Sequence, residues 1–92
     1  MQNFNEEEKL EKKVHKVTII VNGEEKEVKK EKISYEEVII LAFGSYNDSD
    51  DVAYTIMYFR GNNEKPNGFL LKGQEVNVKK EMKFNVSKTN RS

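Results

Sequence analysis

The chain has 92 residues, which suits one compact domain, because two separate cores would each be too small for apolar burial to offset chain entropy. Sixteen Lys and Arg balance 16 Asp and Glu, and this zero net charge argues against nucleic acid or an acidic membrane as the partner. The absence of cysteine excludes disulfides, thiolate metal sites and a thiol nucleophile of the chain's own.

No stretch of the sequence is apolar enough for a membrane span or a secretory signal. The longest apolar run covers residues 38–43, far short of the roughly 20 residues that a spanning helix needs. The first residues lack the apolar core of a signal peptide. Together with the missing cysteines, this predicts a cytoplasmic protein.

Residues 1–15 mix Glu and Lys, and their only sizeable apolar side chains are Phe4, Leu10 and Val14. A Glu8–Lys12 pair would stabilise a helix here by only about 0.2–0.5 kcal/mol. We therefore predict a charged, flexible N-terminal arm rather than part of the folded domain.

A β-hairpin follows the arm. Residues 17–21 read VTIIV, a β-branched run typical of a strand. Asn22 and Gly23 tolerate positive φ and suit a tight turn. Residues 25–29 are mostly charged, and charge discourages pairing with other chains, so we expect them to form an edge strand.

A short helix comes next. Ser34 and Glu37 have the spacing of a capping box, in which each side chain bonds the backbone amide of the other residue. Gly44 is placed to end the helix in the left-handed conformation. The spacing predicts a helix over residues 35–43 whose best buried side chains are Val38, Leu41 and Ala42.

The remainder of the chain is read as strands separated by turns. Residues 44–51 form a polar, acidic loop, and the β-rich run after it is the longest in the sequence. We predict strands over residues 52–60 and 69–71, a period-two segment around Val76 and Val78, and a last strand over residues 83 to about 88.

This order of elements predicts an α+β fold of the ubiquitin-like β-grasp type. A mixed four- to five-stranded sheet packs one face on the single helix, and the first and last strands are central and parallel. The expected domain covers residues 16–89, and residues 90–92 form a C-terminal tail.

The chain resembles a bacterial family, the multiubiquitin domain of ubiquitin-like proteins. The matching stretches are VTIIVNGEEKEV, ISYEEVIILAF, YTIMYFRG and GQEVNVKKEMKFNVSKTNRS, which cover everything after the arm. The resemblance implies a modifier or carrier whose genes adjoin those of activating-enzyme, conjugating-enzyme and JAB-type peptidase homologues. Some of these ubiquitination-like operons are antiviral.

The sequence departs from familiar modifiers in two ways. The family name reflects tandem copies, whereas no internal repeat is present here. Eukaryotic modifiers and sulfur carriers end in Gly-Gly, whereas this sequence reads Thr89, Asn90, Arg91 and Ser92. These four residues are the predicted site of C-terminal conjugation or processing, and the missing glycines weaken a sulfur-carrier function.

No residue pattern points to catalysis, a metal or a cofactor. His15 is the only histidine and stands in the charged arm. Asp48, Asp50 and Asp51 superficially match a calcium loop, but Ala53 and Phe59 occupy the positions that need Gly and Glu. P-loop and dinucleotide spacings are also absent. We therefore predict a non-enzymatic protein without cofactor or metal.

A partner-binding surface is predicted on the face of the sheet that the helix leaves free. Alternation along the strands from Ile19, Ile56 and Phe84, taken as inward, places Ile20, Thr55, Met57 and Asn85 together on that face. Apolar groups gathered on an open sheet indicate protein binding.

The functional hypothesis is a covalent modifier whose C-terminus is activated and transferred by an activating-like and a conjugating-like enzyme to target proteins. A processing peptidase is a further expected partner. The alternative is a non-covalent β-grasp adaptor that partners recognise through the sheet face. Neither hypothesis involves nucleic acid or a membrane.

Overall fold

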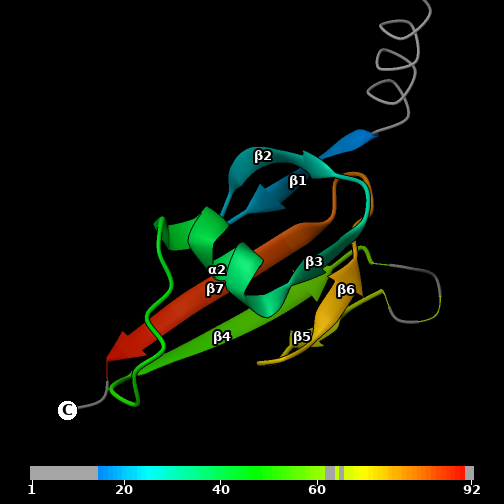
Figure 1. The fold of residues 1–92 in the computed structure, drawn as a ribbon. Coiled ribbons are helices and arrows are strands. Elements are labelled where there is room, and N and C mark those ends of the chain that lie inside the picture. The colour runs from blue at the N-terminus through cyan, green and yellow to red at the C-terminus, as the bar shows by residue number, and fades with distance from the viewer. Residues whose placement is uncertain (1–14, 62–63, 65, 91–92) are drawn as a thin grey trace, which may run out of the picture.

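The computed structural model describes residues 15–61, 64 and 66–90, so most of the predicted arm and the residues Arg91 and Ser92 lie outside it. A five-stranded sheet in the order β2-β1-β7-β4-β5 packs against one helix, and a two-stranded sheet, β3-β6, lies beside it (Figure 1). The elements are β1 (Lys16–Val21), β2 (Glu24–Lys29), β3 (Lys32–Ser34), α2 (Tyr35–Phe43), β4 (Val52–Phe59), β5 (Gly68–Leu70), β6 (Glu75–Asn77) and β7 (Lys83–Asn90).

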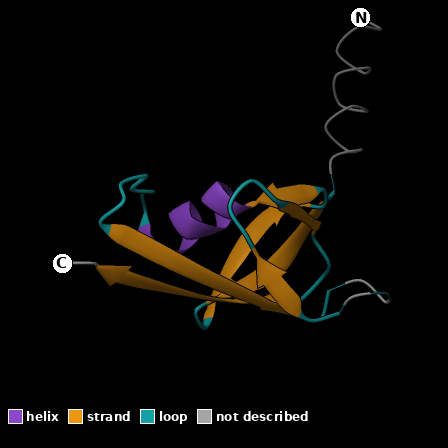
Figure 2. Cartoon of the chain, turned by 90° about the horizontal axis from the view of Figure 1, so that it is seen from below, coloured by secondary structure: helices purple, strands orange, loops and turns teal. Residues whose placement is uncertain are grey.

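The first and last strands are neighbours at the middle of the sheet, which confirms the predicted β-grasp arrangement. β1 and β7 run parallel, with Ile20 opposite Lys83 and Val21 opposite Phe84. The remaining pairs of the large sheet are antiparallel. Figure 2 shows the helix on one face of the sheet only. The opposite face is therefore free of any helix among the described residues.

The β1–β2 hairpin turns at Asn22 and Gly23, as predicted. Their φ angles are 51° and 84°, the positive values that a type I′ turn requires at both central positions. β2 lies at the edge of the sheet, also as predicted. Asn22 has a second role, because its side-chain amide donates to the Val86 carbonyl at 3.0 Å and its side-chain oxygen accepts from the Val86 amide at 2.7 Å.

The predicted caps set both ends of α2. The Ser34 hydroxyl accepts from the Glu37 amide at 3.1 Å, while the Glu37 carboxylate accepts from the Ser34 amide at 2.9 Å. At the other end Gly44 has a φ of 86° and donates its amide to the Ile40 carbonyl at 2.7 Å. These bonds satisfy backbone groups that a helix of 9 residues otherwise leaves open.

The core is entirely apolar and lies between α2 and the large sheet. No polar or charged residue among the described ones is buried. The fully buried side chains come from β1, α2, β4 and β7 and the turn before β7, and they are Ile19, Val21, Val38, Ile39, Ile56, Met82 and Phe84.

The buried face of α2 differs from the predicted one. Val38 is buried as expected, but Leu41 and Ala42 are only partly buried at the margin of the core. Tyr35 and Ile39 take their place. The apolar stripe of α2, with spacing i, i+3 and i+4, therefore begins at Tyr35 instead of Val38, one turn earlier than predicted. The reason is that the Tyr35 ring, at the first helical position, also packs inward.

Two further differences concern the short strands. The period-two segment around Val76 does not join the main sheet, because β6 pairs with β3, a strand that the sequence did not indicate. The last strand is also longer than predicted and continues to Asn90. Three-residue strands carry little pattern of their own, so their pairing depends on tertiary contacts.

We predict that Phe84→Ala lowers the free energy of unfolding by about 3–5 kcal/mol, because it opens a cavity at a side chain with no solvent exposure. Leu41→Ala should cost less, about 1–2 kcal/mol, since this side chain is only partly buried. Urea unfolding followed by circular dichroism measures both. Equal losses for the two variants would contradict the observed orientation of α2.

Candidate functional site

The open face of the sheet carries the predicted partner-binding residues. Along β4, Ile56 and Tyr58 are buried against the helix side, whereas Thr55 and Met57 are exposed. Asn85 of β7 is also exposed. Ile20 of β1 is only partly buried, because its cross-strand neighbours Glu25 and Lys83 flank it.

The strand register brings three of these side chains close together. Met57 lies directly opposite Asn85, and Thr55 lies opposite Ser87 on the same pair of strands. Ile20 lies further along β7, opposite Lys83. Cross-strand partners have Cβ atoms about 4.5–5.5 Å apart, so Met57 and Asn85 form one surface.

Sequence reasoning missed a strongly exposed apolar side chain of this face. Phe69 of β5 lies opposite Met57 and is 55% exposed. Phe69, Met57 and Asn85 therefore form one row across β5, β4 and β7, which we call the open-face row. Leu71, just after β5, is 57% exposed. The sequence contained a signal for this. Residues 69–71 are all apolar, but successive side chains of a strand point to opposite faces, so they cannot all face the core, and only Leu70 does.

The end of β7 carries the predicted conjugation residues that the structure describes. Thr89 lies opposite Ala53 and Asn90 opposite Val52, so both are strand residues, and Asn90 is part of β7 rather than of a tail. Residues 87–90 are all exposed. β1 accompanies β7 only at the strand's beginning, so β4 is the sole strand partner of this last section among the described residues.

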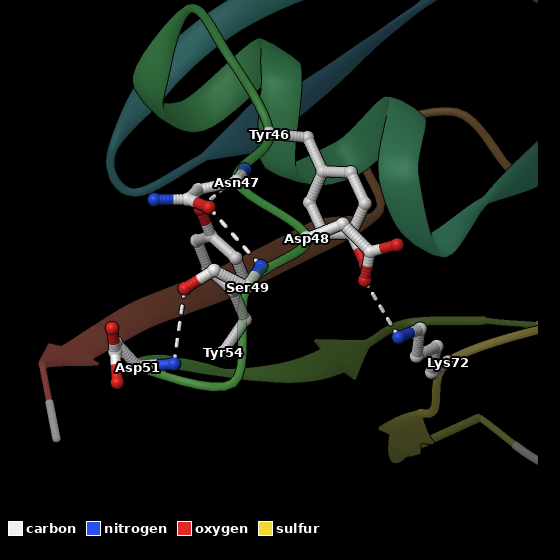
Figure 3. Close-up of polar contacts among 7 residues, drawn as sticks. All are labelled: Tyr46, Asn47, Asp48, Ser49, Asp51, Tyr54 and Lys72. Carbon is white, nitrogen blue, oxygen red and sulfur yellow. Dashed lines mark hydrogen bonds and ion pairs between the residues drawn. The ribbon is translucent and has the colours of Figure 1, made fainter.

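A polar cluster orders the loop that precedes β4 (Figure 3). The Asp48 carboxylate accepts from the Lys72 ammonium at 2.7 Å and from the Tyr46 hydroxyl at 3.2 Å. The backbone amide of Asn47 donates to the Tyr54 hydroxyl at 3.0 Å. The Tyr46 and Tyr54 rings lie 5.5 Å apart. These contacts join the loop to β4 and to the turn after β5, beside the place where β7 ends.

The Asp48–Lys72 ion pair shifts the pKa values of both its members. Its hydrogen bond and the charge of Lys72 lower the pKa of Asp48 from its ordinary value of 3.8. The same contacts raise the pKa of Lys72 above 10.5. Loss of solvent contact, and then the Asp48 charge, raise the pKa of Tyr46 above 10.0. Asp48 therefore stays ionised and structural at neutral pH.

Within residues 15–61, 64 and 66–90, no three His, Asp or Glu groups are placed to hold a metal ion. His15 is exposed, and its backbone carbonyl accepts from the Lys30 amide at 2.7 Å. No described helix is long and apolar enough to cross a membrane. The candidate functional features among the described residues are therefore the open-face row and the exposed end of β7.

The family of the chain follows from its match to a known domain model. The model described as multiubiquitin matches residues 17–90, which include every strand and the helix. The chain belongs to the multiubiquitin family. No curated protein and no solved structure matches it. Small ubiquitin-like domains of this kind are in general non-catalytic.

We predict that Lys72→Met lowers the thermal midpoint at neutral pH but not well below pH 3.8. The lowered pKa of Asp48 means that the ion pair stabilises the fold above 3.8 and loses this effect as pH falls through the folded-state pKa. Scanning calorimetry of both proteins at the two pH values measures the difference. Lys80→Met, at an exposed lysine, is the control. An equal difference at both pH values would contradict the ion pair.

Proposed function

We propose that this chain is a bacterial ubiquitin-like modifier whose C-terminus is activated and transferred to target proteins by partner enzymes. The observation that carries the proposal is the exposure of the last section of β7, in a chain of the multiubiquitin family. That section has β4 as its only described strand partner, so it can leave the sheet without disturbing the core.

Activation and transfer require the C-terminal carboxylate to reach the active sites of the partner enzymes. A carboxylate attacks the α-phosphate of ATP with release of pyrophosphate, and a thiolate of the activating enzyme then displaces AMP to form a thioester. A thiolate of the conjugating enzyme takes over the acyl group and releases the first thiolate. An amine of the target displaces the thiolate to form an amide. The chain itself has no cysteine, so both enzymes supply the thiols. Its own contribution is an extended segment that can enter the active sites.

The side chains of Thr89, Asn90, Arg91 and Ser92 are bulkier than the glycines of familiar modifiers. Two routes accommodate them within the proposal. The partner enzymes have wide channels, or a JAB-type peptidase first removes residues. In either case we expect the partner enzymes to bind the domain through the open-face row. The family suggests a cytoplasmic, antiviral conjugation pathway as the setting.

We predict that deleting residues 88–92 abolishes transfer without unfolding the domain, because residues 88–90 are exposed and Val86, which stays in the shortened chain, belongs to the core. An uncleavable C-terminal fusion should also block transfer. Intact-mass spectrometry after incubation with the partner enzymes and ATP measures the reaction, and circular dichroism checks the fold. Continued transfer after the deletion would contradict a modifier function.

The open-face row favours a second candidate function, a non-covalent adaptor. Three exposed residues in register across three strands form a binding surface whether or not the C-terminus reacts. An adaptor would keep its function after residues 88–92 are removed, so the deletion separates the two candidates.

We predict that Met57→Asp weakens binding to a protein partner at least about tenfold, because it places a charge at the centre of the open-face row. The fold should be retained, since Met57 is 37% exposed. Isothermal titration calorimetry measures the affinity, and Asn77→Asp on β6 is the control. Unchanged binding for Met57→Asp would exclude this face.

A further inference from the structure

The last section of β7 is held to the sheet by few backbone hydrogen bonds. The Asn22 amide donates to the Phe84 carbonyl and the Val86 amide donates to the Asn22 side chain, so even-numbered residues of β7 face β1. Backbone groups alternate along a strand, so odd-numbered residues face β4. Past Val86, β4 is the only described strand that pairs with β7. The backbone bonds of Ser87 and Thr89 to β4 therefore hold this section in place.

One side-chain contact joins this section of β7 to the helix. By strand alternation Lys88 lies on the same face as the buried residues Phe84 and Val86. Its ammonium nitrogen is 6.0 Å from the centroid of the Phe43 ring, and Phe43 is the last residue of α2. The quadrupole of an aromatic ring attracts a cation at such a distance. The contact therefore connects the end of the last strand with the end of the helix.

The Phe43 ring is supported by further aromatic side chains. Its centroid lies 6.1 Å from that of Tyr54, and the Tyr54 ring lies 5.5 Å from that of Tyr46. Tyr54 is opposite Lys88 in the strand register. Because even-numbered residues of β7 face away from β4, this is a non-hydrogen-bonded pair, in which side chains approach more closely. Lys88 is therefore placed beside two rings, one from β4 and one from α2.

The contact with Phe43 is the main side-chain interaction of Lys88 within the described part of the chain. The ion pairs found there involve Lys26 and Lys72 instead. Phe43 is 40% exposed, so it lies outside the fully buried core. Replacing either side chain therefore tests the end of β7 without opening a cavity in the core.

We infer that Phe43 and Lys88 form a clasp that holds the end of β7 on β4 and sets how often the C-terminal segment is released. In the closed state the cation lies over the ring, and Ser87 and Thr89 keep their bonds to β4. In the open state the contact and these bonds break together. The inference rests on the proposed function, because an enzyme active site would require this segment to be free of the sheet.

Hydrogen exchange of the full chain, followed by NMR, measures this release without any partner enzyme. The protection factors of the Ser87 and Thr89 amides report opening of the end of β7, and that of Asn85 reports opening of the middle of the sheet. Phe43→Leu and Lys88→Met should each lower the first two protection factors about twofold to fivefold, as expected for an exposed cation–π contact. The protection factor of Asn85 should not change.

Matched variants separate the contact from a general effect of charge or size. Phe43→Tyr keeps the ring and Lys88→Arg keeps the cation, so both should retain the protection of the wild type. Lys83→Met removes a charge at the exposed start of the same strand and should also leave the end of β7 protected. Combining Phe43→Leu with Lys88→Met should lower protection no more than either change alone, because both remove the same contact.

Four results would overturn the inference. The first is wild-type protection of Thr89 in the Phe43→Leu variant. The second is a double variant whose loss of protection is the product of the two single losses. The third is an equal loss at Asn85, which would mean that the changes loosen the whole sheet. The fourth is a loss of the same size in the Lys83→Met variant.

The transfer reaction distinguishes this inference from the proposed function. With a limiting amount of activating enzyme, Phe43→Leu should be transferred about twofold to fivefold faster than the wild type, since its segment is released more often. Equal rates alongside lowered protection would overturn the clasp as a control of transfer. Transfer of neither protein would contradict the modifier function, and the protection factors would still decide whether the clasp exists.

Discussion

The parallel contact between β1 and β7 is the constraint on which the remaining structure depends. It joins the N-terminal hairpin to the C-terminal half of the sheet through only two residue pairs. Backbone bonds from Ile20 to Met82 and from Asn22 to Phe84, each 2.9 Å long, hold it together. The Asn22 side chain then bonds Val86, which extends the ladder past the end of β1. One turn residue thus both reverses the chain and closes the sheet.

This contact also determines which surfaces remain available. Because β1 and β7 occupy the middle, β2 and β5 become the two edges, and α2 covers a single face. Three separate features follow: the open-face row, the exposed end of β7, and an apolar groove between β2 and α2 that Val28, Ile33, Ile40 and Leu41 line.

The polar contacts of the domain serve local order rather than the core. The Asp48–Lys72 ion pair, the Ser34–Glu37 capping box and the Asn47–Tyr54 bond all involve exposed groups. The core has no buried polar side chain within the described residues. Stability then comes from apolar packing around Phe84 and Ile39, and the polar contacts position the loop before β4 beside the end of β7.

By itself, the sequence determined the elements whose signals are local. The Asn22–Gly23 turn, the capping box at Ser34, the Gly44 cap and the alternation of β4 each depend on a few neighbouring residues, and the family match follows from the same segments. Tertiary structure alone decided the pairing of β3 with β6, the burial of Ile39 in place of Leu41, and the extension of β7 to Asn90. It also decided that Phe69 joins Met57 on the open face and that Ile40 stands over the groove. The reason is physical: short strands and the rotation of a short helix gain their energy from partners distant in sequence, and those partners are brought together only when the sheet closes.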